Sequence, residues 1–527
     1  MQEFEAVANL YGVGDGLEWM NVSNCDWNDS VTNNDKSNNK NRTSFEPIRV
    51  VKLPSDEAAE KIVKRTSLVK FIAHLWGYGT NDEELRKSVF EGRDEHFLSE
   101  SMTYKLTCSD FGRTKSNSAE EIRKRLENLV PDAFQPKAKV DLMNPKVEFL
   151  SCEVSSNEQI DLGFIGVKKY FGRVVAKDQS RARLNLLDLK KRRYLGPTSM
   201  DAHMSLIMCN MVNADEKRYG MILDPFCGTG SVLLTAAELG CLTCGFEIDP
   251  RVLEFGKICK KTGEKIDVLT NFEDYGFQKP VFLIRGDVHK SPLLKGRIHQ
   301  IEGMFQGIVA DPPYGVRERG RKSQFGGRQK KTEEDMKNHF DKLQEGKFAT
   351  SEHIPSTVNY PLSEIMDDLI DLSAKTLPVG GRMCFFLPAD VHQANPETDF
   401  PSHPCFKVVA HSLQNFSTAW GRRLVTYEKT KPFDIEEHLE TISQRELARN
   451  LDTKNGVKDL TERVREFVFE DERSAVRKEF KRDNVQKFKL ERESGIVVDR
   501  EKVIERRERA KALRVKDIAL RNRGKRT

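Results

Sequence analysis

The segment Asp311-Pro312-Pro313-Tyr314 places a carboxylate, two prolines and an aromatic ring directly after the apolar run Gly307–Ala310. Proline fixes φ and has no N–H, so the carbonyl oxygens of such a loop stay available as acceptors. An amine conjugated to a planar ring is a poor nucleophile because its lone pair is delocalised. The Asp311 carboxylate and the Pro312 carbonyl could accept its two N–H bonds as the nitrogen becomes tetrahedral, while Tyr314 stacks on the ring. The segment predicts group transfer to a planar exocyclic nitrogen; the alternative is a rigid proline turn with a surface acid.

A second segment could hold a cofactor. The strand-like run Met221–Leu223 leads into Asp224, then a turn with Gly228 and Gly230, then a helix start at Ser231. Glycine has no Cβ, so the backbone of such a turn can approach a ligand closely. A dinucleotide site needs a third glycine where this chain has a leucine, which disfavours NAD. An ordinary strand-to-helix turn is the alternative.

Three acids at successive strand ends narrow the choice of cofactor. Asp224 could attract the ammonium of a cofactor that carries an amino acid. Glu247 ends the next predicted strand about 20 residues later, the usual place for an acid that binds ribose hydroxyls. Asp287 follows the third predicted strand and suits an adenine amino group. The ordered set predicts S-adenosylmethionine (SAM), and therefore transfer of a methyl group.

Strands and helices alternate from Gly196 onward, which is typical of a parallel sheet with helices on both faces. The predicted strands are 221–223, 241–247, 281–284, 307–310 and 382–387, the helices 231–239, 251–261 and 362–377, and the closing hairpin 407–411 with 423–427. We therefore expect an α/β domain whose strand ends carry the acids.

The region before Gly196 mixes short strands with amphipathic helices and predicts an α+β unit. Its predicted strands are 48–53, 104–106, 147–150, 163–167 and 170–175, and its helices are 57–63, 84–89 and 118–129.

Four segments follow from these patterns. Residues 1–45 form a partial N-terminal start and an Asn-rich disordered loop, and 46–195 form the α+β region with its connector. The α/β domain spans 196–432, with a basic insert at 316–360, and 433–527 is a charged helical tail with little core.

The net charge of +5 is uneven, because residues 441–527 hold 26 Lys and Arg against 17 Asp and Glu. A basic end on a near-neutral body suggests nucleic acid as a partner, although a solvated helical face has the same composition. We assign phosphate binding to cations of the connector and the insert, while a disordered loop remains open for the middle of the insert. These cations are Lys191, Arg192, Arg193, Arg317, Arg319, Arg321 and Lys322.

Composition excludes other classes of protein. No apolar run approaches the roughly 18 residues that span a bilayer, and the acidic start is unlike a secretory signal. Cys241 and Cys244 form a lone CxxC with no second pair at zinc-finger spacing, so we expect no metal site. Ten scattered cysteines fit reduced thiols, and a cytoplasmic location is expected.

The run Lys191–Ala202, the Asp224 loop and Asp311–Gly315 together resemble the eukaryotic tRNA (guanine-10-N2) methyltransferases, over about Phe45 to Lys429. The resemblance implies a ferredoxin-like segment and a THUMP domain that grips tRNA, followed by a Rossmann-like class I methyltransferase domain. It implies methyl transfer from SAM to the guanine N2 at position 10, and a small zinc-binding activator protein as partner.

The resemblance also assigns residues. Asp311, Pro312, Pro313 and Tyr314 match the catalytic loop. The cofactor site is matched by Asp224, Phe226, Gly228, Gly230, Glu247 and Asp287, with Thr198 and Ser199 near the methionine end of SAM.

Three departures from the family and two rival functions remain open. The chain enters at a predicted helix, 3–12, where the family has a strand first, the Asn-rich stretch follows directly, and the tail is longer than the family core requires. The same loop chemistry would also serve adenine N6, cytosine N4 or a glutamine side chain. A subunit that binds RNA without catalysis is the rival of another class, which the intact loops at Asp224 and Asp311 disfavour.

Overall fold

The computed structural model describes most of the chain in segments. These are residues 1–20, 47–111, 119–129, 133–134, 136–156, 166–215, 220–259, 262–291, 293, 302–315, 320–323, 357–393, 396–417, 420–455, 458 and 460–469. The Asn-rich stretch, most of the 316–360 insert and the tail beyond residue 469 lie outside them. The chain divides into two compact units, Met1–Leu186 and Leu187–Thr527, so the basic connector belongs to the second unit and not, as predicted, to the first.

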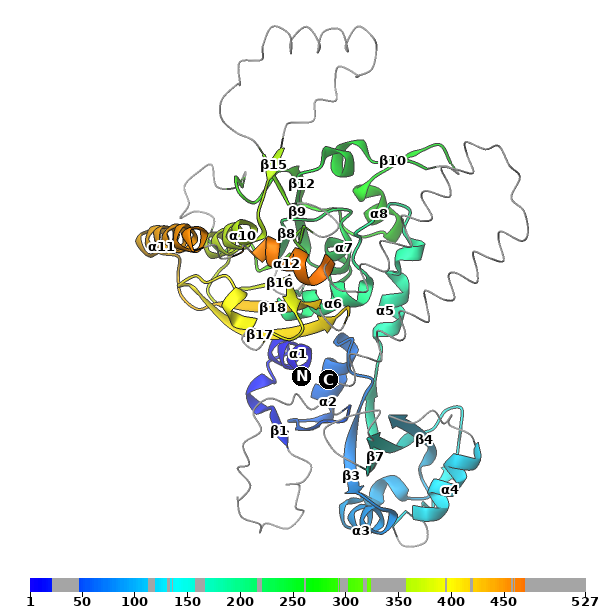
Figure 1. The fold of residues 1–527 in the computed structure, drawn as a ribbon. Helices are drawn as coiled ribbons and strands as arrows, with labels where there is room; N and C mark the ends of the chain where they lie inside the picture. The colour runs from blue at the N-terminus through cyan, green and yellow to red at the C-terminus, as the bar shows by residue number, and fades with distance from the viewer. Residues whose placement is uncertain are drawn as a thin grey trace, which may run out of the picture. The chain divides into compact units, whose positions relative to one another are not determined.

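The first unit is an α+β fold, as predicted, around a five-stranded sheet of order β3-β7-β6-β4-β5 (Figure 1). Its elements are α1 (Gln2–Leu10), β1 (Glu18–Met20), β2 (Val50–Lys52), α2 (Asp56–Arg65), β3 (Phe71–Gly79), α3 (Asp82–Gly92), β4 (Thr103–Phe111), α4 (Ala119–Leu129), β5 (Lys139–Val140), β6 (Val147–Ser156), β7 (Gly166–Lys177) and α5 (Ser180–Leu186). β6 runs parallel to β4 and antiparallel to β7.

Strand β3 was not predicted from the sequence. A Cβ on Gly77 or Gly79 would lie within 3.0 Å of α3 backbone atoms, so these glycines let helix and strand pack closely. The two short strands predicted around residue 170 are one strand, β7, in the described residues. Gly172 lies inside it, where a Cβ would meet the His74 carbonyl at 2.2 Å. At this position glycine permits close packing against β3 and does not interrupt β7.

The predicted N-terminal helix is confirmed as α1. Glu3 is 3% exposed and accepts hydrogen bonds from the Ser67 amide and hydroxyl and from the Leu68 amide. Phe4 and Val7 pack with Ile62 of α2. The helix is therefore part of the folded unit.

The second unit is built on a seven-stranded sheet of order β12-β9-β8-β13-β16-β18-β17 (Figure 1). Its elements are α6 (Ala202–Met211), β8 (Met221–Asp224), α7 (Ser231–Glu238), β9 (Leu242–Glu247), β10 (Lys257–Ile258), β11 (Lys265–Ile266), α8 (Val268–Tyr275), β12 (Phe282–Arg285), β13 (Gly307–Ala310), β14 (Arg321–Ser323), β15 (Thr357–Asn359), α10 (Leu362–Thr376), β16 (Arg382–Asp390), β17 (Phe406–Asn415), β18 (Trp420–Lys429), α11 (Ile435–Lys454) and α12 (Leu460–Phe469). The five strands from β12 to β16 pair in parallel, and β18 and β17 pair antiparallel. The parallel pairing of these five strands agrees with the parallel sheet predicted from the sequence.

Helices cover both faces of this sheet, as predicted. Phe246 of β9 joins a core with Leu369 of α10, whereas a Cβ on the adjacent Gly245 would touch Leu233 of α7. Neighbouring residues of a strand point to opposite faces, so α10 and α7 lie on opposite sides. No helix of the described residues is long and apolar enough to cross a membrane.

Two predictions about the second unit are wrong. The helix predicted at 251–261 is a single π-turn, Arg251–Phe255, which ends at Gly256 with φ +60°. The tail contributes to the core, because Leu460 and Val464 of α12 are buried with residues of β13, β16 and α10. Part of the tail is therefore integral to this unit.

Candidate active site

Four acids lie along one edge of the second sheet. Asp224 ends β8, Glu247 ends β9, Asp287 follows β12 by two residues and Asp311 follows β13 directly. The strands are parallel neighbours, so their carboxyl ends meet at the same edge, in the order Asp287, Glu247, Asp224, Asp311. Ligands of open α/β sheets bind at this edge, where the strand order reverses. Sheet topology thus brings together the acids predicted from sequence.

Asp224 is the most deeply buried of these acids, with 3% of its surface exposed. Its Oδ1 accepts a hydrogen bond from the Phe226 amide at 3.0 Å. Burial raises the pKa of Asp224 to about 8, the Phe226 amide opposes the rise, and the charges of Asp311 and Glu247 add to it. A buried carboxylate among other acids favours a cation beside it. The site therefore fits an ammonium group, as predicted for SAM.

The glycine turn is held against the next strand. The Gly228 amide donates to Glu247 Oε2 at 3.0 Å, and the Cys227 amide donates to the Phe246 carbonyl at 2.8 Å. Gly230 has φ +78° and precedes α7, and a Cβ there would meet Val268 at 2.9 Å. Glu247 also accepts from the Asp249 amide at 2.9 Å, which fixes its carboxylate at the strand end.

The remaining predicted cofactor residues differ in position. Ser199 Oγ lies 2.8 Å from Thr229 Oγ1 of the glycine turn and accepts from the Gly196 amide at 3.0 Å. Asp287 is buried and accepts from the Lys290 amide at 2.8 Å. Thr198 is exposed. The structure thus brings Ser199 to the glycine turn, a contact that the sequence could not specify.

The catalytic loop is tied together by its own side chains. The Tyr314 hydroxyl donates to Asp311 Oδ1, and Pro312 between them in the chain is buried. Burial, with the charge of Asp311, raises the pKa of the Tyr314 hydroxyl well above its usual range, so it stays a neutral donor. A carboxylate has about four acceptor positions, so Asp311 can still accept an N–H from a substrate. Its side chain is 27% exposed and within reach of one.

Arg422 of β18 completes the surroundings of Asp311, and no motif in the sequence indicated it. Its Nη1 lies 3.5 and 3.4 Å from the two Asp311 carboxylate oxygens. Its Nε donates to Gln414 Oε1 at 2.8 Å, and its guanidinium lies 3.6 Å from the Phe386 ring centroid. These contacts hold Arg422 in one orientation and set a fixed positive charge beside the predicted catalytic acid.

The three predicted RNA-binding cations of the connector have different surroundings. Lys191 is exposed. Arg192 is 6% exposed, and it donates to Ser231 Oγ at 2.7 Å and to the Leu187 carbonyl at 3.3 Å. Arg193 pairs with Asp274, its Nε 2.7 Å from Oδ2. Arg192 therefore fixes the connector to α7 from inside the fold, and its assignment to RNA contact is corrected.

The cations predicted in the insert are described only in part. Arg317 and Arg319 lie outside the described residues. Arg321 is exposed on β14 and donates to Thr357 Oγ1 of β15 at 3.0 Å. Lys322 pairs with Glu364 of α10 and lies 5.3 Å from the Tyr360 ring centroid. Arg321 thus keeps its charge toward solvent, whereas Lys322 is engaged within the protein.

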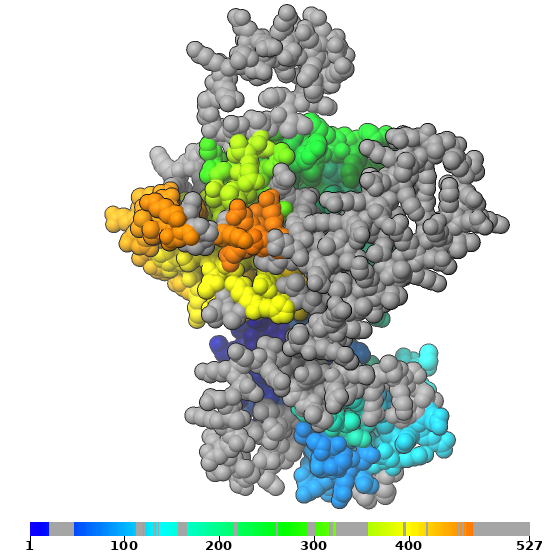
Figure 2. Space-filling model, viewed as in Figure 1, coloured from blue at the N-terminus to red at the C-terminus, as the bar shows by residue number. Residues whose placement is uncertain are grey.

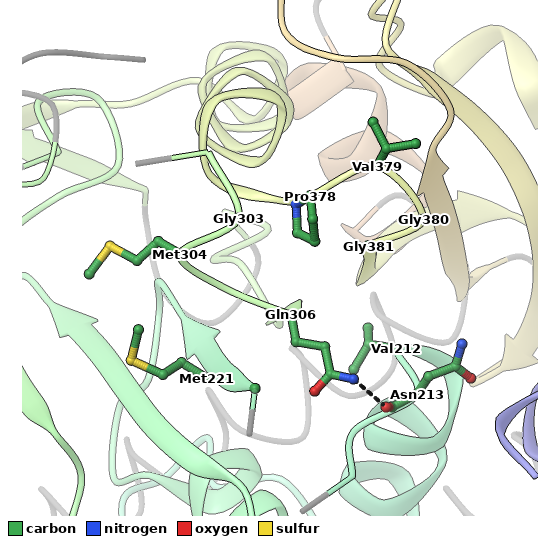
Figure 3. Close-up of a pocket in the computed structure, with 11 residues that line it drawn as sticks. Val212, Asn213, Met221, Gly303, Met304, Gln306, Pro378, Val379, Gly380 and Gly381 are labelled. Carbon is green, nitrogen blue, oxygen red and sulfur yellow. Dashed lines mark hydrogen bonds between the residues drawn. The ribbon is translucent and has the colours of Figure 1, made fainter. Parts of the chain in front are cut away.

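A hollow of about 380 Å³ lies at the opposite edge of the sheet (Figure 3). It is lined by Met221 at the start of β8, Gln306 before β13 and Gly381 before β16. Figure 3 shows the Gln306 amide turned to the Asn213 carbonyl, which accepts its hydrogen bond at 3.3 Å. These are the amino ends of the strands, so the hollow is separate from the acids.

Asp371, His403 and His438 gather where α11 meets α10, with potential ligand atoms within 4.8 Å of one another. His403 Nδ1 accepts the Cys405 amide at 3.1 Å, which leaves the ring proton on Nε2, 3.3 Å from His438 Nδ1. Nε2 therefore donates to His438 and has no lone pair for a cation. Burial lowers the pKa of His403 to about 3 and of His438 to about 4. We describe the cluster as a neutral histidine pair.

Comparisons with known proteins agree with both units. Residues 37–180 match the family model described as the Tmrp11 THUMP N-terminal domain. Residues 190–261, which include β8, the glycine turn and β9, match the RMKL-like methyltransferase domain.

Curated relatives cover most of the chain. The tRNA (guanine(10)-N(2))-methyltransferase TRMT11 of Mus musculus is 32% identical over 414 residues, which is 77% of this chain and 84% of that protein. TRMT11 of Homo sapiens is 33% identical over 400 residues, 74% of this chain and 81% of that protein. TRMT11 of Dictyostelium discoideum is 32% identical over 408 residues, 74% of each.

Proposed function

This chain belongs to the tRNA (guanine(10)-N2)-methyltransferase family, and on that premise we propose that it methylates the exocyclic N2 of guanosine 10 in tRNA, with SAM as donor. The observation that carries the proposal is the line of four acids at the carboxyl edge, which ends at Asp311. Three of them suit the donor and the fourth suits the nitrogen that receives the methyl group.

The residues present fit SAM. Asp224 would pair with the ammonium group of SAM. Burial raises the pKa of this carboxyl, and a positive charge beside it stabilises the ionised form. Glu247 would accept from ribose hydroxyls, and Asp287 would accept from the adenine amino group. When bound, SAM supplies an electrophilic methyl group.

The chain's own contribution to the chemistry is to hold the amine and accept its proton. The Asp311 carboxylate and the Pro312 carbonyl would accept the two N2 hydrogens, which directs the lone pair of the nitrogen toward the methyl donor. Asp311 would then take up the proton that the nitrogen loses. Arg422 keeps a positive charge beside Asp311 throughout, and it steadies the carboxylate in the orientation that accepts the N–H bond.

The target base must leave its stack to reach Asp311. Tyr314 would stack on the guanine ring. Its hydroxyl donates a hydrogen bond to Asp311. The THUMP-containing first unit would hold the tRNA body while the base enters the second unit.

Mass analysis of nucleosides from tRNA treated with SAM, the protein and the small zinc-binding activator that the family resemblance implies tests this function. We expect N2-methylguanosine. N6-methyladenosine or N4-methylcytidine would refute the choice of base. Methylation of glutamine in a parallel reaction with a protein substrate, with no methylated nucleoside in the tRNA, would refute the choice of RNA.

We also propose a small zinc-binding activator protein as partner and a cytoplasmic location. The resemblance to the family implies the first, and the nine free cysteines among the described residues suit a reducing compartment. Affinity purification of the tagged chain, followed by mass spectrometry and zinc analysis of the small co-purifying protein, tests the partner. Recovery of the chain alone, with full activity, would contradict it. Microscopy of the tagged chain tests the location, and an organelle signal would refute it.

A further inference from the structure

Helix α12 belongs to the methyltransferase unit although it lies beyond the sheet in sequence. Val464 is fully buried and Leu460 is 8% exposed, both in the core formed with β16 and α10. Thr461 Oγ1 accepts the Leu362 amide, the first of α10, at 2.8 Å. Arg463 pairs with Asp399 at 2.7 Å. These contacts fix α12 on the domain through apolar, capping and ionic interactions.

The same helix reaches the catalytic loop. Gly315, directly after Tyr314, has φ +80°. A Cβ on Gly315 would lie 3.2 Å from Thr461 Cγ2 and 4.0 Å from Arg465 Nε. The side chains of one helix turn therefore lie against the end of the Asp311–Tyr314 segment, and α12 forms a wall beside it.

Arg465 differs from the neighbouring arginine on this helix. It is half-buried, and in the part of the chain that the structure describes it has no acid and no hydrogen-bond acceptor as partner. Arg463, by contrast, is bound to Asp399. A guanidinium held beside a catalytic loop without an acid partner is suited to a phosphate, which it can bind with two parallel hydrogen bonds. α12 is also at the surface of the face shown in Figure 2, where it is drawn in orange.

We infer that α12 is the wall of the substrate entrance and that Arg465 binds a backbone phosphate next to the nucleoside to be methylated. The inference rests on the proposed function, because RNA is the ligand that brings phosphates to this loop. A base that leaves its stack swings about its own backbone, so the adjacent phosphate must be held while the base occupies the site. Arg465 is placed to do this at the end of the catalytic loop.

The test replaces Arg465 by Gln and, as a matched control, Lys454 by Gln. Lys454 is an exposed cation at the end of α11, so both variants lose one positive charge. We expect R465Q to raise the KM for tRNA about 10-fold and to lower the salt slope of tRNA binding by about 1, with an unchanged Kd for SAM and an unchanged melting temperature. We expect R465K to recover part of the affinity.

Equal KM values and salt slopes for R465Q and K454Q would overturn the inference. A lower melting temperature of R465Q with weaker SAM binding would also overturn it, since it would assign Arg465 to the packing of α12. The proposed function is judged separately on the wild-type protein. If wild-type protein together with its activator forms no N2-methylguanosine, that function fails, while the salt slopes still decide whether Arg465 contacts RNA phosphate.

Discussion

Replacing Arg422 by Met tests whether a fixed charge beside Asp311 is needed for methyl transfer. Met keeps much of the apolar contact with Phe386 but removes the charge and the donors to Asp311 and Gln414. The two side chains are 12% and 27% exposed, so their interaction is only partly screened by water. We expect the variant to fold and to bind SAM as the wild type does.

The size of the effect follows from the geometry. At 3.4 Å between Arg422 Nη1 and Asp311 Oδ2, an effective dielectric constant near 20 gives a ceiling of about 5 kcal/mol. Loss of a hydrogen bond to a charged group typically costs about 1.5–3 kcal/mol, and the contact is long. We therefore expect kcat to fall by about 10- to 100-fold. Removal of a cation also favours protonation of Asp311, so the acidic limb of the kcat profile should move to higher pH.

Steady-state kinetics of the variant from pH 5.5 to 8.5, at saturating tRNA and SAM, provides the measurement. Arg422→Lys is the conservative control, since it keeps a charge near Asp311, and it should lose less activity than the Met variant. A Met variant with wild-type kcat and an unmoved acidic limb would refute the role of Arg422. A fall in SAM affinity as large as the fall in kcat would assign Arg422 to the stability of the fold.

Four further predictions follow from buried or strand-end groups. Asp224 must ionise to pair with an ammonium, so the affinity for SAM should rise by up to about tenfold per pH unit from pH 6 toward 8. Calorimetry in buffers of different ionisation enthalpy should detect the released proton. An affinity that does not change with pH would contradict this. Because the pKa of Asp224 is raised in the folded apoprotein, its contribution to stability is full below about pH 4 and is lost as pH rises toward about 8. The Asp224→Asn apoprotein should therefore have a higher melting temperature than wild type at pH 8. It should also bind SAM poorly, because the carboxylate that pairs with the ammonium is gone. The lowered pKa values of His403 and His438 stabilise the folded state fully above about pH 6.5, and this stability is lost as pH falls toward 4, by up to about 1.4 kcal/mol per pH unit for each histidine. His438→Gln should reduce the dependence of the free energy of urea unfolding on pH. An unchanged dependence would argue against the neutral pair. Glu247→Gln should raise the Kd for SAM by about 10- to 100-fold, with little change in kcat at saturating SAM. Titration with labelled SAM measures the Kd, and an unaltered Kd would show that Glu247 does not bind the ribose.

The acids were predictable because each belongs to a local pattern. Asp224, Glu247, Asp287 and Asp311 all stand at or just after the end of a short apolar run, and parallel strands align such ends without further information. Arg422 was not predictable, since its place depends on the antiparallel register that sets it opposite Pro388. That register pairs positions 34 residues apart and brings Arg422 to Asp311, which lies 111 residues earlier in the chain.

The other differences between the predicted and the observed structure arise from burial. The charge of the connector predicted exposed cations, yet Arg192 is enclosed because its guanidinium reaches Ser231 of α7. The charged composition of the tail predicted little core, yet Leu460 and Val464, two apolar residues of α12, complete the core. Composition averages over a segment, whereas packing depends on a few positions within it.

The most direct test of the account replaces guanosine 10 of a tRNA substrate by inosine, which lacks only the exocyclic N2, and follows transfer of a labelled methyl group from SAM. We expect the methyl group to be incorporated into the guanosine tRNA and not into the inosine tRNA, with both tRNAs bound equally well. Equal incorporation into both would contradict it, because the methyl group would then reside on another atom.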